Sequence, residues 1–404
     1  MHKVFYLLRS FKNDKRLFCI EPFVDRKEYQ PMNTDKTKKK VEELLAYADI
    51  EINGKRPWDI KVHHPALYAR ILAGGMLAAG ESYMDGWWDC DALDQLIDRI
   101  LKAQHVLKKL LPKRLGWDVI KARIINTQRK SQAYVIGKRH YDTGNDLFRV
   151  MLDRRMNYSC GYWKNATNLD QAQEAKLKLI AKKLKLAQGM TVLDIGCGWG
   201  SLAKFLAEHY NVNVTGITVS EEQISLAREM CQGLPVKIKY QDYRDLDEKF
   251  DRVVSVGMFE HVGYKNYKNF FTIVKKCLAD NGIFLLHTIG GNRSGKIGNP
   301  WIDKYIFPNG MLPSASQITR AYEGMFKLED WHNFGTDYDK TLMAWYQNFN
   351  LNWDKIKGQY DERFKRMWHY YLLTCAGGFR AHLNQLWQII LSKIDAQIDY
   401  ESVR

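Results

Sequence analysis

The stretch VLDIGCGWGSLAKFL, residues 192–206, places three glycines within five positions between an apolar run and a helical pattern. This order predicts a strand, a tight turn and a helix. Because glycine has no Cβ atom, the spacing indicates a backbone that comes close to a ligand. In open α/β sheets, such turns lie at the carboxyl edge, where ligands bind.

Two common ligand-binding turns, the P-loop and the dinucleotide-binding turn, do not match this sequence. A P-loop needs Lys and then Ser or Thr after its last glycine, whereas Gly200 is followed by Ser-Leu. The third glycine of a dinucleotide turn would fall on Ser201, which disfavours a pyrophosphate. The remaining pattern resembles the first motif of the S-adenosylmethionine-dependent methyltransferase fold. Its residues are Asp194, Gly196, Gly198 and Gly200.

Other parts of a cofactor site follow by analogy with that fold. Its second strand commonly ends in an acid that binds the ribose hydroxyls, whereas VTGIT ends here in Thr218. The Thr218 hydroxyl and the Gln223 amide, one helical turn further on, are the candidates for ribose. Asp242, just beyond the third strand, is the candidate for the adenine amino group; a turn or helix-capping aspartate is the alternative interpretation.

The pattern after residue 140 alternates helical segments with β-branched runs, which predicts a parallel, Rossmann-like α/β sheet. The expected strands are MTVLDIG, NVTGITV, VKIKYQD, FDRVVSVG and GIFLLHTIG. The tail from Thr341 is expected to be helical, because apolar residues recur there at helical spacing. The apolar residues near the end of this tail are Leu386, Trp387, Ile389 and Ile390.

Four segments are expected in the 404-residue chain. Residues 1–36 form a basic extension without clear pattern, 37–110 a small helical domain, 111–140 a basic amphipathic linker, and 141–404 the methyltransferase domain. Trp87 and Trp88 are expected in the core of the helical domain.

The formal charge of +15 favours a partner with a negative surface. Between Lys102 and Arg139 many bases alternate with apolar residues against a single acid, Asp118. Such a stretch can lie on an anionic membrane or serve as a solvated linker helix, and the sequence leaves both open. Nucleic acid is not expected, because no binding motif accompanies the charge.

The seven cysteines form no CxxC pair, so neither a disulfide framework nor a metal site is expected. A reducing cytoplasm fits this pattern. No stretch approaches eighteen continuous apolar residues, so membrane contact is expected to be peripheral.

The methyl acceptor is indicated by motifs outside the glycine turn. The fourth strand ends in SVGMFEHVG, not in the NPPY type of sequence that methylates amide-like nitrogen. With GESYMDGWWDCD, HYDTGNDLF, YSCGYW, LLHTIG and HNFGTDYDKTL, the chain closely resembles the cyclopropane-fatty-acyl-phospholipid synthase family from about residue 40 to 395.

The resemblance implies methylene transfer from S-adenosylmethionine to the cis double bond of phospholipid acyl chains, with a bound bicarbonate as general base. It also implies a homodimer that works at the inner face of the cell membrane, with residues 37–110 as a lipid-binding domain. It assigns Tyr158 and Ser159 to the cofactor. The residues that would hold bicarbonate are Cys160, Glu260, His287, the backbone at Ile289, and Tyr338. Taken singly, each also has a structural interpretation as a packed or hydrogen-bonded core residue.

Two alternatives remain. A related enzyme could stop at a methyl-branched or methylene product, or act on a soluble acceptor, and gas chromatography of the product separates these. A non-catalytic lipid-binding protein could keep the fold; the intact glycine turn argues against it, and a lack of cofactor binding would favour it.

Overall fold

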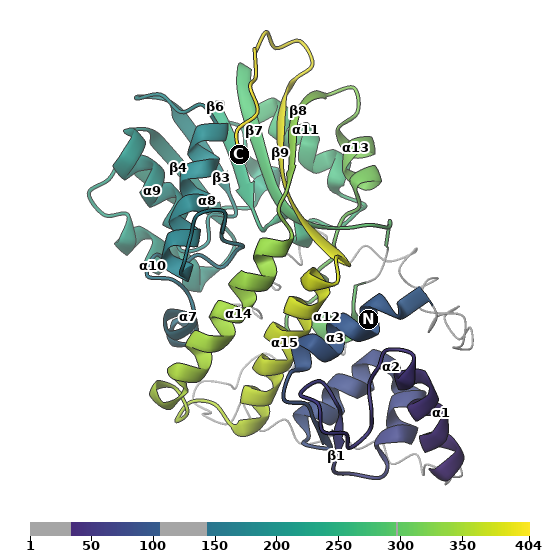
Figure 1. Ribbon diagram of the computed structural model, residues 1–404. Coiled ribbons are helices and arrows are strands. Elements are labelled where there is room, and N and C mark those ends of the chain that lie inside the picture. Colours follow the sequence, from purple (N-terminus) through teal and green to yellow (C-terminus); the bar gives the residue numbers. More distant parts are fainter. Residues whose placement is uncertain (1–33, 106–143, 296–297) are drawn as a thin grey trace, which may run out of the picture.

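The computed structural model describes residues 34–105, 144–295 and 298–404 (Figure 1). The predicted linker 111–140 lies outside these ranges, as does the predicted extension up to residue 33, so both stay predictions. Within the described ranges, no helix has the length and apolar character needed to span a bilayer.

A seven-stranded sheet forms the centre of the larger part of the molecule, with the order β5-β4-β3-β6-β7-β9-β8. The five strands predicted from sequence, β3 to β7, pair in parallel, which confirms the Rossmann-like fold. The strands are β3 (Thr191–Ile195), β4 (Asn213–Thr218), β5 (Val236–Tyr240), β6 (Phe250–Val256), β7 (Leu278–Gly291), β8 (Phe326–Asn333) and β9 (Asn384–Lys393).

The last strand corrects the predicted helical tail. β9 pairs antiparallel with both β7 and β8, so Leu386, Trp387, Ile389 and Ile390 lie in a strand. All four side chains are buried. A strand that is covered on both faces has a continuous apolar run, which periodicity cannot distinguish from a buried helix. The predicted helical character does hold for α14 (Thr336–Leu351) and α15 (Glu362–Arg380).

Helices cover both faces of the sheet (Figure 1). Alternate residues of β7 show the two layers: Ile283 and Leu285 pack in one core with α8 and α9, whereas Phe284 and Leu286 pack in the other with α11 and α13. The helices of these layers are α8 (Leu169–Lys183), α9 (Ser201–Tyr210), α10 (Glu221–Met230), α11 (Tyr267–Cys277) and α13 (Ala315–Tyr322).

The order of the sheet fixes the position of the glycine turn. From β3 the chain continues to β4 and β5 on one side, and then to β6 and β7 on the other. Ligands bind outside the carboxyl ends of the strands at such a switch point. The turn that follows β3 therefore lies beside the segment that follows β6.

The N-terminal part is mainly helical, as predicted. Trp88 is buried in its core, while Trp87 is half-buried and stacks on His64 with 4.1 Å between ring centroids. Its elements are α1 (Thr34–Ala46), β1 (Lys61–Val62), α2 (Leu67–Met84), β2 (Trp88–Asp89) and α3 (Leu93–Lys102).

These N-terminal helices share one core with α12 (Pro300–Tyr305), α14 and α15 (Figure 1). The approach is close: a Cβ atom at Gly80 would lie 2.4 Å from the Trp301 ring. Arg366 of α15 also binds Asp89 at 2.7 Å. The helical part is therefore packed firmly against the methyltransferase part, and the predicted boundary near residue 110 lies outside the described ranges.

Candidate active site

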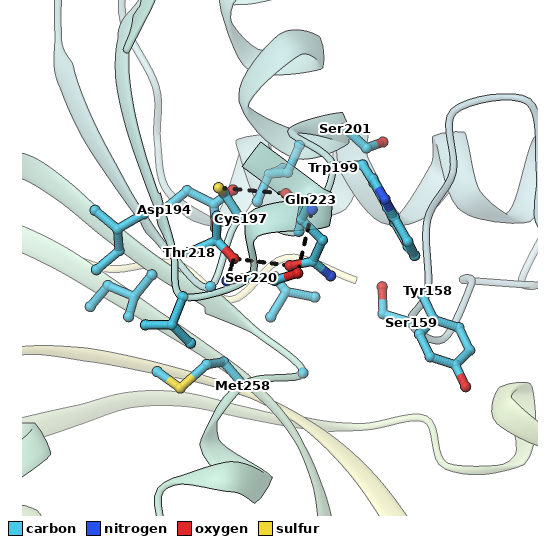
Figure 2. Close-up of a pocket in the computed structure, with 18 of the residues that line it drawn as sticks. Tyr158, Ser159, Asp194, Cys197, Trp199, Ser201, Thr218, Ser220, Gln223 and Met258 are labelled. Carbon is cyan, nitrogen blue, oxygen red and sulfur yellow. Dashed lines mark hydrogen bonds between the residues drawn. The ribbon is translucent and has the colours of Figure 1, made fainter. Parts of the chain in front are cut away.

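The turn after β3 brings the backbone against a cavity at the switch point (Figure 2). Gly196 and Gly198 have φ of 84° and 55°, in the left-handed region that glycine adopts without strain. A Cβ at Gly196 would lie 2.7 Å from the Met258 side chain. Glycine is therefore required at 196 both by its backbone conformation and by the close approach of the chain after β6.

Eight of the nine predicted cofactor residues line this cavity. They are Tyr158, Ser159, Asp194, Gly196, Gly198, Thr218, Gln223 and Asp242. Gly200 does not line it: a Cβ there would lie 3.1 Å from Cys231 Sγ and 3.3 Å from Ala227 Cβ of the neighbouring α10. Gly200, with φ of 80°, thus caps α9 and allows α10 to pack closely.

The end of β4 presents an amide in a fixed orientation. Thr218 Oγ1 donates to Gln223 Oε1 at 2.9 Å and accepts the Ser220 backbone N–H at 3.2 Å (Figure 2). Because Oε1 already binds Thr218, the NH₂ group is the part of the Gln223 amide left to bind a ligand. This arrangement suits the acceptor oxygens of a ribose, and the ribose assignment stays a prediction.

Asp242 both caps a turn and lines the cavity. Its carboxylate accepts the Arg244 backbone N–H at 2.9 Å and the Arg244 guanidinium at 3.3 Å. It therefore caps the short 3₁₀ turn Tyr243–Asp245 while it lines the cavity. Its place at the end of β5 keeps the adenine assignment a prediction.

A buried cation, which the sequence did not reveal, lies beside the glycine turn. Lys176 of α8 lines the cavity and donates to Ser159 Oγ at 2.8 Å and to Asn157 Oδ1 at 3.2 Å. Burial lowers the pKa of Lys176 to about 8, and burial raises the pKa of Asp194 to about 7 against the opposing effect of Lys176. A single lysine on a helix carries no signal that it points inward.

The predicted bicarbonate residues form a second buried cluster next to the cavity. Glu260, in the 3₁₀ turn Phe259–His261 that follows β6, accepts the Ile289 backbone N–H on Oε1 at 2.7 Å. The Ile289 carbonyl accepts from Thr288 Oγ1 at 3.0 Å. Glu260 Oε2 is buried and has no partner among the described residues, and burial raises the pKa of Glu260 to about 7.

His287, on β7, adjoins the same cluster: its ring lies 5.9 Å from Phe334 between centroids, and Phe334 packs with Cys160. Gln388 Nε2 lies 3.3 Å from His287 Nδ1; in this orientation of the Gln388 amide, Nδ1 accepts and Nε2 of the ring carries the proton. That Nε2 is buried without a partner in the described part of the chain. Because burial lowers the pKa of His287 well below its usual range, the ring is a neutral donor.

Cys160 and Tyr338 complete the cluster. The Cys160 thiol lies 3.9 Å from Thr341 Oγ1, and burial holds its pKa well above the usual range. Tyr338 and Ile289 pack against the small core cluster that Cys160 forms with Phe334 and Leu386. Burial raises the pKa of Tyr338 well above its usual range, with Cys160 and Glu260 adding to the effect, so its phenol stays protonated.

None of the five predicted bicarbonate residues lines the glycine-turn cavity, but each end of the cluster adjoins it. Ser159 and His261 line the cavity and are the chain neighbours of Cys160 and Glu260. Aromatic rings connect the two regions: Trp345 lies 5.2 Å from Tyr158 and 5.9 Å from Tyr338, between ring centroids. The cofactor cavity and the polar cluster thus share one wall.

His261, left unassigned from sequence, lines the cavity with a buried Nδ1 that has no partner among the described residues. Burial lowers its pKa to about 4, so the ring is neutral at pH 7. His140, another residue considered from sequence, lies outside the described ranges.

Comparison with known sequences identifies the family of the chain. The family model for mycolic acid cyclopropane synthetase matches residues 128–389. Cyclopropane-fatty-acyl-phospholipid synthase of Escherichia coli strain K12 is 55% identical over 354 residues, which cover 87% of this chain and 92% of that protein. Tuberculostearic acid methyltransferase of Mycobacterium tuberculosis is 32% identical over 375 residues, covering 85% and 86%.

Solved structures give the same relationship. A cyclopropane synthase from Mycobacterium tuberculosis superposes with a TM-score of 0.60 at 30% identity, covering 64% of this chain and 98% of that one. A mycolic acid cyclopropane synthase complexed with SAH and CTAB gives 0.59 at 33% identity, covering 64% and 97%. The chain therefore belongs to the cyclopropane-fatty-acyl-phospholipid synthase family of S-adenosylmethionine-dependent methyltransferases.

Proposed function

We propose that this protein transfers a methylene group from S-adenosylmethionine to the cis double bond of unsaturated phospholipid acyl chains and closes a cyclopropane ring. The observation that carries the proposal is the shared wall between a cofactor cavity and a buried cluster of polar groups without partners. The 55% identical E. coli relative, a cyclopropane-fatty-acyl-phospholipid synthase, supports the same acceptor.

The cavity suits the cofactor, whose sulfonium supplies an electrophilic methyl group. The glycine turn lets the backbone approach, and the Gln223 amide and Asp242 lie at the ends of β4 and β5. Tyr158 and Ser159 form the opposite side of the cavity (Figure 2). We therefore place the methyl group near Tyr158, between the glycine turn and the polar cluster.

Methyl transfer to a double bond leaves positive charge on the acceptor carbon, and the wall beside Tyr158 is built to tolerate it. Tyr158 has Phe148 at 5.0 Å and Trp345 at 5.2 Å between ring centroids. Aromatic faces attract cations and exclude water. His261, which is neutral at pH 7, adds no positive charge that would repel this cation.

The polar cluster fits hydrogencarbonate, which would accept the proton lost in ring closure. His287 Nε2–H is a donor without a partner and Glu260 Oε2 is an acceptor without one, among the described residues. Tyr338, which stays protonated, is a further donor. An anion with one O–H and two acceptor oxygens matches this set. The O–H directed at Glu260 reduces the repulsion between the two anions.

The Ile289 N–H acts on Glu260 in this arrangement. Its hydrogen bond at 2.7 Å fixes one carboxylate oxygen and leaves the other facing the cluster. In this proposal the Ile289 backbone N–H would act on the anion through Glu260 and not by a direct hydrogen bond.

We further propose that the enzyme works in the cytoplasm as a homodimer on anionic phospholipid at the inner face of the cell membrane. The charge of +15 supports an anionic surface. The kinked centre of α2 also exposes an apolar segment that includes Met76, whose side chain is 60% exposed. Flotation with phosphatidylglycerol vesicles, compared with phosphatidylcholine vesicles, tests binding to an anionic lipid surface. The molar mass from light scattering tests the homodimer.

The activity is tested with vesicles of unsaturated phospholipid and S-adenosylmethionine. Fatty acids that gain one methylene and elute with cyclopropane standards support the proposal; methyl-branched products, or none, contradict it. The bicarbonate part is tested in buffer freed of carbon dioxide. Turnover should fall there and return when bicarbonate is added, and unchanged turnover would exclude this base.

A further inference from the structure

We propose that Lys176 is the positioning residue for the carboxylate of the cofactor: it fixes Ser159 as a hydrogen-bond donor and supplies the positive charge behind it. The inference rests on S-adenosylmethionine as the cofactor, and it extends the site to a residue of α8 that sequence motifs do not mark.

A hydrogen bond joins Lys176 and Ser159. The Lys176 ammonium can only donate, so at 2.8 Å it uses a lone pair of Ser159 Oγ. The hydroxyl hydrogen of Ser159 is then left to donate elsewhere, and Ser159 lines the cavity. Figure 2 shows its oxygen directed into the space between the glycine turn and Tyr158.

Helix α8 holds the segment that contains Asn157 and Ser159 at more than one point. Gln173 Nε2 donates to the Ser159 carbonyl at 2.7 Å, and Lys176 also donates to Asn157 Oδ1 at 3.2 Å. The same Asn157 oxygen accepts from Ser201 Oγ, at the start of α9, at 3.0 Å. Lys176 thus ties the Ser159 segment to the helix that begins after the glycine turn.

The positive charge of Lys176 is suited to the carboxylate of the cofactor. The amino-acid part of the cofactor carries a carboxylate, which loses hydration when it enters the cavity and needs donors or a cation there. Among the described residues that line the cavity, Arg244 is paired with Asp242 at the end of β5. Lys176 is the cation next to the glycine turn. Its position therefore places the carboxylate beside Ser159 and the adenosine part toward Thr218 and Asp242.

The test compares two ligands by calorimetry: S-adenosylmethionine and its decarboxylated analogue, which lacks only the carboxylate. In Lys176→Met, affinity for S-adenosylmethionine should fall about 10- to 100-fold, the range for hydrogen bonds to charged groups, while affinity for the analogue changes less than about threefold. Equal losses for both ligands would show a structural role and overturn the proposal, as would no loss for either.

Lys183 provides a matched control on the same helix. It is also buried, with a pKa lowered to about 8, but it binds Asp330 at 3.2 Å and does not line the cavity. Lys183→Met should leave the ratio of the two affinities unchanged, whatever it does to stability.

Ser159→Ala keeps the proposal testable if Lys176→Met does not fold. It should reduce the preference for the carboxylated ligand in the same direction, and a retained preference would overturn the proposal. Failure to form a ring from lipid, with normal cofactor binding, would contradict the proposed reaction and leave this inference standing.

Discussion

Glu260 accepts the backbone N–H of Ile289 at 2.7 Å, which ties the turn after β6 to β7 across the end of the sheet. The contact uses one oxygen of a buried carboxylate and leaves the other without a partner among the described residues. Such a half-satisfied group costs stability and is typical of a functional site.

Glu260→Gln should lower kcat by about 10²- to 10⁴-fold, because the hydrogencarbonate that acts as general base would lose its acceptor, with cofactor affinity changed less than about twofold. The wild-type rate should rise with pH through about 7, where the carboxyl ionises. Steady-state kinetics and calorimetry measure both. The exposed Glu323→Gln is the control. A loss of affinity in step with rate would contradict the assigned role.

The same variant should be more stable than the wild type at pH 8. Burial raises the pKa of Glu260 from 4.5 to about 7, so its contribution to stability is fully present below pH 4.5 and is lost as pH rises through 7. Glutamine stays neutral, so the gain in the free energy of unfolding should reach about 3 kcal/mol at pH 8. Urea unfolding at pH 5 and pH 8 measures it. A gain that does not grow with pH would refute this explanation.

Tyr338→Phe should lower turnover by about 10²-fold through loss of one hydroxyl donor, with little change in cofactor affinity. The ring keeps its packing against Phe379, 4.6 Å away between centroids, so the melting temperature should barely move. Tyr322→Phe, at the end of α13 and buried in the core, is the control and should keep full turnover. Normal turnover in Tyr338→Phe would remove the phenol from the mechanism.

Gly196→Ala should abolish cofactor binding, whereas Gly189→Ala should not. Both glycines have φ of 84°, so each alanine introduces about 1–2 kcal/mol of backbone strain. At Gly189 nothing lies within 4 Å of the added Cβ, but at Gly196 the Met258 side chain lies 2.7 Å away. Calorimetry and urea unfolding separate the shared strain from the local clash. Equal affinities in the two variants would contradict the assigned turn.

The sequence predicted those parts of the fold and site that depend on local patterns. Strands β3 to β7 were found because β-branched runs alternate with helical segments, and the glycine turn because Gly196 and Gly198 require a left-handed backbone. The assignment of Leu386 to a helix failed because a doubly covered strand and a buried helix have similar apolar runs.

Other features depend on tertiary contacts that no local pattern records. Lys176 lies in a helix whose other lysines include exposed ones such as Lys178, and only packing shows which points inward. Gly200 belongs to the motif, yet its neighbours are Ala227 of α10 and Cys231, which caps that helix. The cofactor motif therefore predicted the position of the turn but not the role of each glycine.

The most direct test of the central claim uses S-adenosylmethionine with a fully deuterated methyl group and vesicles of monounsaturated phospholipid. Ring closure requires that one hydrogen leave the transferred carbon, so mass spectrometry of the separated fatty acids should show a cyclopropane product that carries two deuterium atoms. A product that retains all three, or that elutes as a branched chain, would contradict the account.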